Sequence, residues 1–337
     1  MLPLVLTDEE WDAVVPDETV MRPGAEALCA RLGVGGLPLE RFAEGSVPVY
    51  AVGAEHVLKL FPAASARDGL VEERVLARVD GALPIPTPSV RAAGEYVNGW
   101  RYILMSRLPG EGLAPAWPRI PPPDRERIAR DCGEALAALH ALDPGPLAEV
   151  LGPGDWPAFL ARQRAGAVDR QRERGLAEAW LEQIPDFLAA APLPVAPPPA
   201  GPLPAAPAPA VPARALLHTE FMREHLLTDP ADGWRLTGLI DFEPAMIGDP
   251  AYDLVAVGLF TTRADPHLLG RLLDAYGRRF EPRLLMAYTL LHVYSNLPWY
   301  LRELKPSART LDALAEEWFG AGQETAPQGR GSVRSRL

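Results

Sequence analysis

The sequence has few cysteines and no segment built for a membrane or for export. Cys29 and Cys132 are the only cysteines among 337 residues, and their number and spacing indicate neither a disulfide framework nor a zinc site. No apolar run reaches the about 18–20 residues that a membrane span requires. The opening residues, MLPLVLTDEEW, lack the basic segment and cleavage site of a secretory signal. We therefore expect a cytoplasmic protein without a membrane partner.

Positive charge is also in short supply. Lysine and arginine total 33 against 44 aspartates and glutamates, so the net charge is −11. This balance argues against a nucleic-acid partner and favours a cationic small molecule as substrate. A hydrophobic content of 48% and a charged content of 23% are ordinary for a globular protein. The length suits one large domain or two lobes, and the oligomeric state stays open.

The most informative stretch is residues 216–254, in which acidic groups flank a predicted hairpin. Glu220 and His225 lie in a polar loop that interrupts an apolar run, and Asp241 ends a second apolar run at residues 236–240. Between them, DPADG at residues 229–233 has the composition of a turn. The hairpin would gather the three side chains around one small volume. Phosphoryl transfer needs such a grouping, with one group orienting the acceptor and others holding a metal.

This stretch resembles the paired motifs of the aminoglycoside phosphotransferase family. HTEFMREH at residues 218–225 is in register with the family's H-G-D-x-x-x-x-N, and IDFEPAMIGDPAYD at residues 240–253 matches I-D-F/W-x-x-x-x-x-G-D-x-x-Y-D. With MSRLPG at residues 105–110, the chain is most similar to the hygromycin B phosphotransferases. The resemblance covers roughly residues 40–320.

The resemblance implies an α+β, bilobal, protein-kinase-like fold. A small lobe with an antiparallel sheet would occupy residues 1–106 and bind the nucleotide, and a larger, mainly helical lobe would occupy residues 107–320 and bind the acceptor. Residues 191–213 hold ten prolines in 23 positions, which predicts an extended or mobile loop within the second lobe. Residues 321–337 are predicted to be a disordered tail.

The resemblance also assigns catalytic and metal-binding roles, with two departures from the family pattern. Glu220 replaces the catalytic Asp and would orient the acceptor hydroxyl, and His225 replaces the metal-binding Asn. Asp241 and His225 would hold Mg²⁺, although imidazole suits a softer ion such as Mn²⁺ better. His218 would orient the loop by hydrogen bonds, and Arg223 is a candidate contact to substrate or phosphate.

A second group of residues is predicted to bind ATP or GTP. Lys59 lies on a predicted strand at residues 56–61, on the face shared with Val57 and Phe61. From the strand alone it is either a lysine whose charge reaches the sheet edge or a phosphate ligand, and the resemblance implies the second. Glu72, on a helix predicted over residues 70–79, would hold it, and two solvated glutamates at 72 and 73 are the alternative.

Three further nucleotide contacts rest on position. Ser46 lies in the turn EGSVP at residues 44–48, which would cover the phosphates, but an ordinary turn serine fits equally well. The segment at 105–110 would be the hinge between lobes, with backbone groups of Ser106 and Leu108 bonding the adenine edge.

The remaining pattern predicts the elements around these sites. Strands are expected at 47–52, 56–61, 89–93 and 100–105. Helices are expected at 25–32, from 124 to about 142, at 268–280, 284–301 and 311–319, with one or two more within 155–190. His140, at the end of its helical stripe, is expected to be a structural, hydrogen-bonded residue.

Two functions of different classes follow from the sequence. The first is an ATP-dependent O-phosphotransferase acting on a hydroxyl of an aminoglycoside-type antibiotic and giving resistance. The second is a pseudokinase that keeps the fold and binds nucleotide without turnover, because both altered positions lie in the catalytic motif. Within the first class, a nucleoside antibiotic, choline or an amino sugar metabolite is an alternative acceptor.

Overall fold

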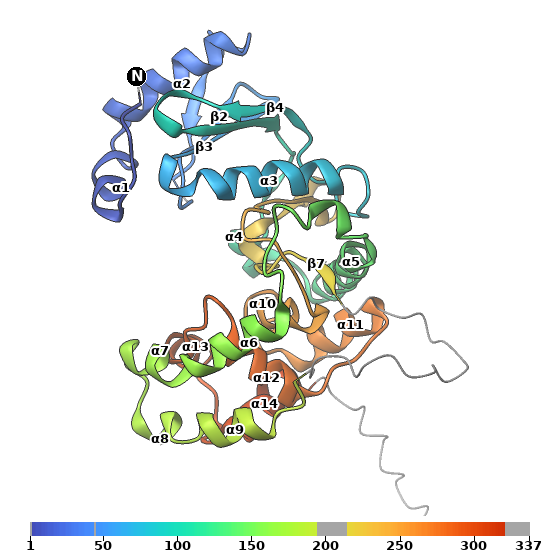
Figure 1. The fold of residues 1–337 in the computed structure, drawn as a ribbon. Helices are drawn as coiled ribbons and strands as arrows, with labels where there is room; N and C mark the ends of the chain where they lie inside the picture. Colours follow the sequence, from blue (N-terminus) through green and yellow to red (C-terminus); the bar gives the residue numbers. More distant parts are fainter. Residues whose placement is uncertain (1, 44, 194–213, 321–337) are drawn as a thin grey trace, which may run out of the picture.

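The computed structural model describes residues 2–43, 45–193 and 214–320. Most of the proline-rich tract and the whole predicted tail, residues 194–213 and 321–337, therefore lie outside the described residues. Figure 1 shows a sheet-containing part, drawn in blue to cyan, above a larger helical part. This is the predicted bilobal α+β, kinase-like fold. Strand β5 (Arg101–Ser106) ends at the residue chosen as the lobe boundary, and that boundary stays a prediction.

The small lobe is built on a five-stranded antiparallel sheet. Its spatial order is β1-β2-β3-β5-β4, with β1 at Leu39–Arg41, β2 at Val49–Val52, β3 at His56–Phe61 and β4 at Val90–Glu95. The strands predicted at 47–52 and 56–61 pair as a hairpin, in which Val52 pairs with His56 and Val49 with Lys59. Strand β3 is central, so Lys59 lies between two neighbours and cannot reach a sheet edge.

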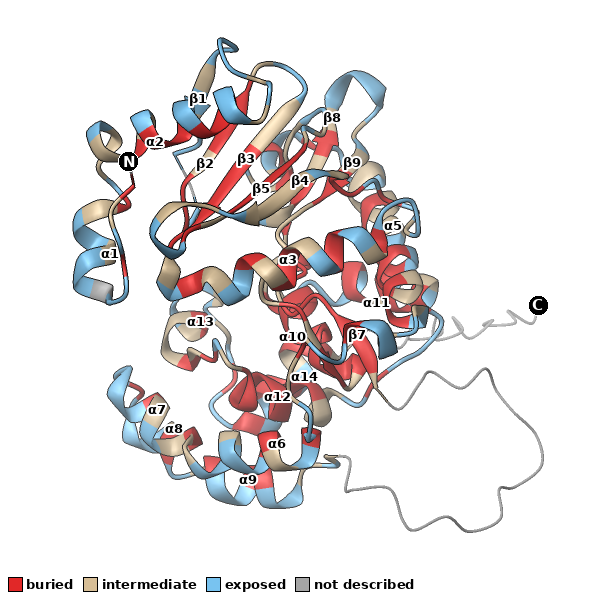
Figure 2. Cartoon of the chain, turned by 45° about the horizontal axis from the view of Figure 1, so that its top comes forward, coloured by how far each residue is buried: buried red, intermediate tan, exposed pale blue. Residues whose placement is uncertain are grey.

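Helices cover both faces of this sheet. Helix α3 (Ala66–Val79) packs Val75, Leu76 and Val79 against Phe61 on one face. Helices α1 (Asp8–Val14) and α2 (Glu18–Arg31) cover the other face, where Leu58 belongs to a separate apolar cluster. The alternation of β3 therefore places Lys59 on the α3 side, as its pattern predicts. Figure 2 shows the buried positions on these facing surfaces.

The large lobe is mainly helical, with two small sheets near the cleft. Strands β6 (Glu111–Gly112), β8 (Leu226–Asp229) and β9 (Arg235–Leu239) form one, and β7 (Ala215–Leu217) pairs with β10 (Met246–Gly248) in the other. The helices are α4 (Leu113–Ala116), α5 (Pro122–Ala141), α6 (Trp156–Ala165), α7 (Ala167–Glu173), α8 (Glu178–Leu181), α9 (Ile184–Ala190), α10 (Leu254–Ala256), α11 (Pro266–Tyr276), α12 (Pro282–Leu291), α13 (Leu297–Leu304) and α14 (Leu311–Phe319). None of the described helices is both long and apolar enough to cross a bilayer.

Two helix predictions were wrong in their continuity. The helix expected at 284–301 is broken at residues 292–296, because Asn296 caps a new helix, accepting the N–H of Trp299, and Pro298 follows in its first turn. The region 155–190 holds four short helices instead of one or two. Gly166 and Gly175, the latter at φ 84°, lie at breaks between them.

Candidate active site

The predicted hairpin is present and gathers the three polar groups. Strand β8 follows the loop that carries Glu220 and His225, and β9 returns antiparallel to it, so Leu226 faces Leu239. The turn between them ends at Gly233, in the left-handed conformation that its composition predicts. One ligand atom each from Glu220, His225 and Asp241 lies within 4.8 Å of the others.

A single buried carboxylate holds the start of this loop. Asp253 accepts the backbone N–H of His218 at 2.9 Å and that of Thr219 at 2.6 Å. His140, on α5, places its Nε2 at 2.9 Å from the same carboxylate and its Nδ1 at 2.9 Å from the hydroxyl of Tyr276. His140 is therefore a structural residue, as expected, and Asp253 links α5 to the loop of residues 218–225, which carries Glu220 and His225. The Nε2 of His218 also contacts the carbonyl of Ile240 at 3.1 Å, which ties the loop to β9.

Backbone strain marks both ends of the candidate site. Thr219, beside Glu220, has φ 66°, and Asp241 has φ 71°. Such values are unfavourable for residues with a Cβ and persist where surrounding contacts over-determine them, often at functional sites. Each of the two residues has such a contact. The hydroxyl of Thr219 donates to the carbonyl of Pro244 at 2.9 Å, and the carboxylate of Asp241 accepts from Nζ of Lys59.

Lys59 is surrounded by three carboxylates from both lobes. Its Nζ lies 2.8 Å from Glu72 Oε2, 2.6 Å from Asp241 Oδ1 and 2.8 Å from Glu243 Oε2. Glu73 points elsewhere and pairs with Arg101 at 2.8 Å, so the choice of Glu72 over its neighbour agrees with the geometry. The contribution of Glu243 was not foreseen from the sequence.

The charges around Lys59 are mutually dependent. Burial alone would lower the pKa of Lys59, but Glu72 and the two other acids outweigh it and hold that pKa well above 10.5. Burial raises the pKa of Glu72 from 4.5 to about 7, against the opposing effect of Lys59. Burial also opposes ionisation of Asp241, yet Lys59 and then His225 bring its pKa below the ordinary value. The amine thus favours the charged form of Asp241, whereas burial outweighs its effect on Glu72.

Glu220 is set apart from these acids by its environment. Burial raises its pKa, His225 offsets part of that effect, and the charges of Asp241 and Glu243 add to it. A carboxylate with a raised pKa is a better proton acceptor near neutral pH than an ordinary one. Its position and basicity fit the orientation of an acceptor hydroxyl.

The hydrogen bonds of His225 leave one ring nitrogen facing a carboxylate. Nδ1 lies 2.9 Å from the carbonyl oxygen of Glu220, which only accepts, so Nδ1 carries a hydrogen. Nε2 lies 3.1 Å from Asp241 Oδ2. In the neutral ring Nε2 has a lone pair, and two acceptors at this distance repel unless a proton or a metal ion lies between them.

The donor set therefore fits a divalent cation. A second group, formed by Glu72, Asp241 and Glu243, also has its ligand atoms within 4.8 Å. The Oε2 atoms of Glu72 and Glu243 each lie 2.8 Å from Nζ of Lys59, so in this group the ammonium ion already supplies the positive charge that the carboxylates need. Asp241 belongs to both groups, so it would supply an oxygen ligand to a cation held by either of them.

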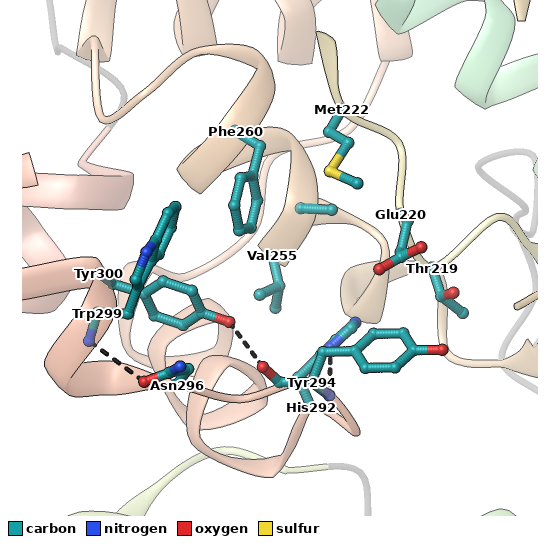
Figure 3. A pocket seen from close by; sticks show the side chains of 11 residues that line it. Thr219, Glu220, Met222, Val255, Phe260, His292, Tyr294, Asn296, Trp299 and Tyr300 are labelled. Atoms are coloured by element: carbon teal, nitrogen blue, oxygen red, sulfur yellow. Dashed lines mark hydrogen bonds between the residues drawn. The ribbon is translucent and has the colours of Figure 1, made fainter. Parts of the chain in front are cut away.

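Next to Glu220 is a pocket of about 290 Å³ with aromatic walls. Figure 3 shows the carboxylate of Glu220 at one end and the rings of Phe260, Trp299 and Tyr300 at the other. The hydroxyl of Tyr300 donates to the carbonyl of Tyr294 at 3.1 Å, which fixes part of this wall. The helix break at 292–296 supplies Tyr294 to the pocket. Sequence reasoning placed acceptor-binding helices here without identifying these residues.

The three remaining candidates lie around the same cleft. The hydroxyl of Ser46 contacts Glu243 at 3.3 Å, which brings its turn over the carboxylates. The N–H of Ser106 donates to the carbonyl of Ser89 at 2.9 Å, and its hydroxyl accepts the N–H of Ser89 at 2.9 Å. The N–H of Leu108 donates to no group among the residues described. Their nucleotide roles stay predictions.

Comparison with known proteins identifies the family to which the chain belongs. Residues 38–288 match the model of a family described as a phosphotransferase enzyme family. The chain is 26% identical over 258 residues to viomycin phosphotransferase of Streptomyces vinaceus, covering 72% of this chain and 79% of that protein.

Solved structures of similar fold are related to this chain at low identity. The GDP complex of an aminoglycoside 2'-phosphotransferase-IIIa mutant has a TM-score of 0.64 at 17% identity, covering 90% of this chain and 94% of its own. A thermostable aminoglycoside phosphotransferase mutant in ternary complex with ADP and hygromycin B has a TM-score of 0.58 at 22% identity, covering 88% and 99%. These likenesses show the fold.

Proposed function

The chain belongs to the phosphotransferase enzyme family, and from this premise we propose that it transfers the γ-phosphate of ATP to a hydroxyl of an aminoglycoside-type, hygromycin B-like antibiotic. Resistance to that antibiotic would be the result, and GTP is the alternative donor. The observation that carries the proposal is the double position of Glu220. Its carboxylate belongs to the ligand group with His225 and Asp241 and also lines the pocket beside them.

The small lobe supplies the nucleotide contacts in this proposal. Lys59, kept charged by Glu72, would bind phosphate oxygens, and Ser46 lies in the turn that would cover them. The carbonyl of Ser106 and the N–H of Leu108 would bond the adenine edge. In this arrangement the terminal phosphate would lie near Asp241, because Lys59 contacts that residue.

The large lobe supplies the metal and acceptor contacts. Asp241 and His225, with Glu243 as a further oxygen ligand, would hold Mg²⁺ or Mn²⁺, which neutralises phosphate charge during transfer. Glu220 would accept the hydrogen of the acceptor hydroxyl and orient its oxygen toward the phosphate. The pocket beside it would bind the rest of the acceptor, and the net charge of −11 favours a cationic one.

Substitution of Glu220 tests the proposal directly. Glu220→Ala is expected to lower turnover about 10²–10⁴-fold, the range for loss of a general base. ATP affinity should be unchanged, because the phosphate contacts come from Lys59 and Asp241. Glu224→Ala is the matched control, since Glu224 is exposed in the same loop. Unchanged turnover in Glu220→Ala would remove this residue from the mechanism.

The pseudokinase remains a second candidate because Glu220 and His225 both depart from the family motif. It predicts nucleotide binding without product. A screen of aminoglycosides, nucleoside antibiotics, choline and amino sugars with labelled ATP decides between the two. The aromatic wall formed by Phe260, Trp299 and Tyr300 is the reason to include acceptors with planar rings, which stack on such side chains. Label on any acceptor ends the pseudokinase hypothesis.

A further inference from the structure

A second pocket, of about 450 Å³, lies in the large lobe and has no part in the proposed reaction. Its walls come from Trp117 and the first turns of α5, from Arg223 in the loop before β8, and from residues between 262 and 268, which lead into α11. Helices α5 and α11 lie side by side in Figures 1 and 2, which brings these segments together.

Three arginines line this pocket and none is paired with an acid. Arg125, Arg223 and Arg263 form no ion pair within the described residues. Nη2 of Arg125 donates to the carbonyl of Trp117 at 3.0 Å, while its buried Nε has no partner among those residues. Three guanidinium groups that line one pocket outside any ion pair repel one another, and an anion bound between them would offset that repulsion.

Arg223 is the buried member of this group. Only 7% of the residue is exposed, and its guanidinium carbon lies 3.6 Å from the centre of the Trp117 ring. Nε donates to the carbonyl of Thr261 at 2.7 Å, which leaves the Nη groups for the pocket. Burial, and then the charge of Arg263, lowers its pKa to about 9. Arg263 and Arg125, which line the second pocket, lower this pKa, whereas Glu224 of the same loop raises it.

The acids that line the pocket are already engaged. Glu126 contacts Nε2 of His267 at 3.1 Å and Nε of Arg271 at 3.2 Å. Asp265 caps α11, where one oxygen accepts the N–H groups of His267 at 2.9 Å and Leu268 at 3.1 Å. Neither carboxylate neutralises the arginines, so an added anion meets little competition from within the pocket.

The backbone that presents Arg263 is strained. Arg263 has φ 53° and Ala264 has φ 58°, two successive residues in a conformation that side chains disfavour. They follow a π-helical turn at Val257–Thr261, a rare form that is frequent at functional sites. Strain of this kind costs free energy and persists only where the surrounding structure holds it in place.

We propose that the pocket formed by Arg125, Arg223 and Arg263 binds a small phosphate-type anion, either free phosphate or a phosphomonoester. Guanidinium groups match the geometry of phosphate oxygens with paired N–H donors. A volume of about 450 Å³ leaves room for an organic group attached to the phosphate. Arg223 lines this pocket, whereas Glu220 and Met222 of the same loop line the aromatic one, so the anion would contact the loop away from the acceptor pocket.

Thermal unfolding without magnesium tests the site. The cleft around Lys59 is lined by carboxylates, so it does not hold phosphate without a metal. Inorganic phosphate and glycerol 3-phosphate are compared with sodium chloride at equal ionic strength. Both phosphate compounds are expected to raise Tm more than chloride does. The compound that raises Tm more shows whether the site prefers free phosphate or a phosphomonoester. If neither compound raises Tm more than sodium chloride does, the proposed site is refuted.

Two substitutions locate the binding without touching the buried arginine. Arg263→Gln and Arg125→Gln should each weaken phosphate binding about tenfold, the cost of losing a hydrogen bond to a charged group. Arg91→Gln is the control, because Arg91 is exposed on β4 and has no ion pair among the described residues. Phosphate should also slow amide exchange at residues 219–226, and Arg263→Gln should abolish that effect. Equal phosphate binding by all three variants would overturn the proposal.

Discussion

Replacing Glu72 by glutamine should make the protein less sensitive to rising pH. Only 2% of Glu72 is exposed, and burial raises its pKa from 4.5 to about 7. Between those two values the folded protein binds a proton that the unfolded chain has already released. The stability of the wild type due to this group therefore falls as pH rises from 4.5 to 7. Glutamine does not titrate, so the stability of the variant does not fall for this reason as pH rises.

The size of the effect follows from the same pKa. Each pKa unit corresponds to about 1.4 kcal/mol, so a rise from 4.5 to about 7 is worth about 3 kcal/mol. The free energy of unfolding of Glu72→Gln, relative to the wild type, should increase by most of that amount between pH 5 and pH 8. At the same time nucleotide affinity should fall, because Lys59 loses one of the three acids that hold it.

Urea denaturation at several pH values measures this difference. Taking the difference removes other titrating groups, such as His218 and His292, whose pKa values are lowered by burial to about 4 in both proteins. Glu73→Gln is the matched control, since Glu73 is next in sequence and pairs with Arg101 near the surface. A stability difference between Glu72→Gln and wild type that is constant with pH would refute the reasoning.

Three further changes test other parts of the structure. Asp241→Asn should abolish metal-dependent nucleotide binding, and a normal magnesium titration followed by nucleotide fluorescence would contradict its role as ligand. His225→Asn restores an oxygen ligand and should raise activity with Mg²⁺ relative to Mn²⁺ about tenfold, measured as the ratio of kcat/KM values; an unchanged ratio would exclude metal contact. Gly133→Ala should destabilise the fold by about 1–3 kcal/mol in urea denaturation, because the added Cβ would lie 2.2 Å from the carbonyl oxygen of Leu272 on α11. If Gly133→Ala is as stable as the wild type, α5 and α11 can move apart at little cost in free energy.

The sequence was most informative where periodicity or a turn decides position. The alternation of β3 put Lys59 on the α3 side, and the DPADG turn set the hairpin that brings Asp241 to Glu220. Glu72 and Glu73 are adjacent and therefore about 100° apart on a helix, so only one of them was able to face the amine. These inferences use local rules that hold whatever the rest of the chain does.

The features that escaped prediction depend on contacts between distant segments. Glu243 lies in a stretch with no regular period, and only the folded chain brings it to Lys59. The break at residues 292–296 was readable from Asn296 and Pro298, but the continuous apolar pattern on both sides favoured one helix. The second pocket joins residues from 117 to 268, and no local pattern connects them.

The three contacts of Lys59 have a consequence for how the cleft opens. Glu72 belongs to the small lobe, whereas Asp241 and Glu243 belong to the large one, so a single amine fastens the two lobes together. In the proposed reaction, an incoming triphosphate would compete with Asp241 and Glu243 for the ammonium group of Lys59. Binding of the nucleotide would therefore break the ion pairs that join the two lobes. A negatively charged compound that binds Lys59 would both separate the lobes and compete with the nucleotide.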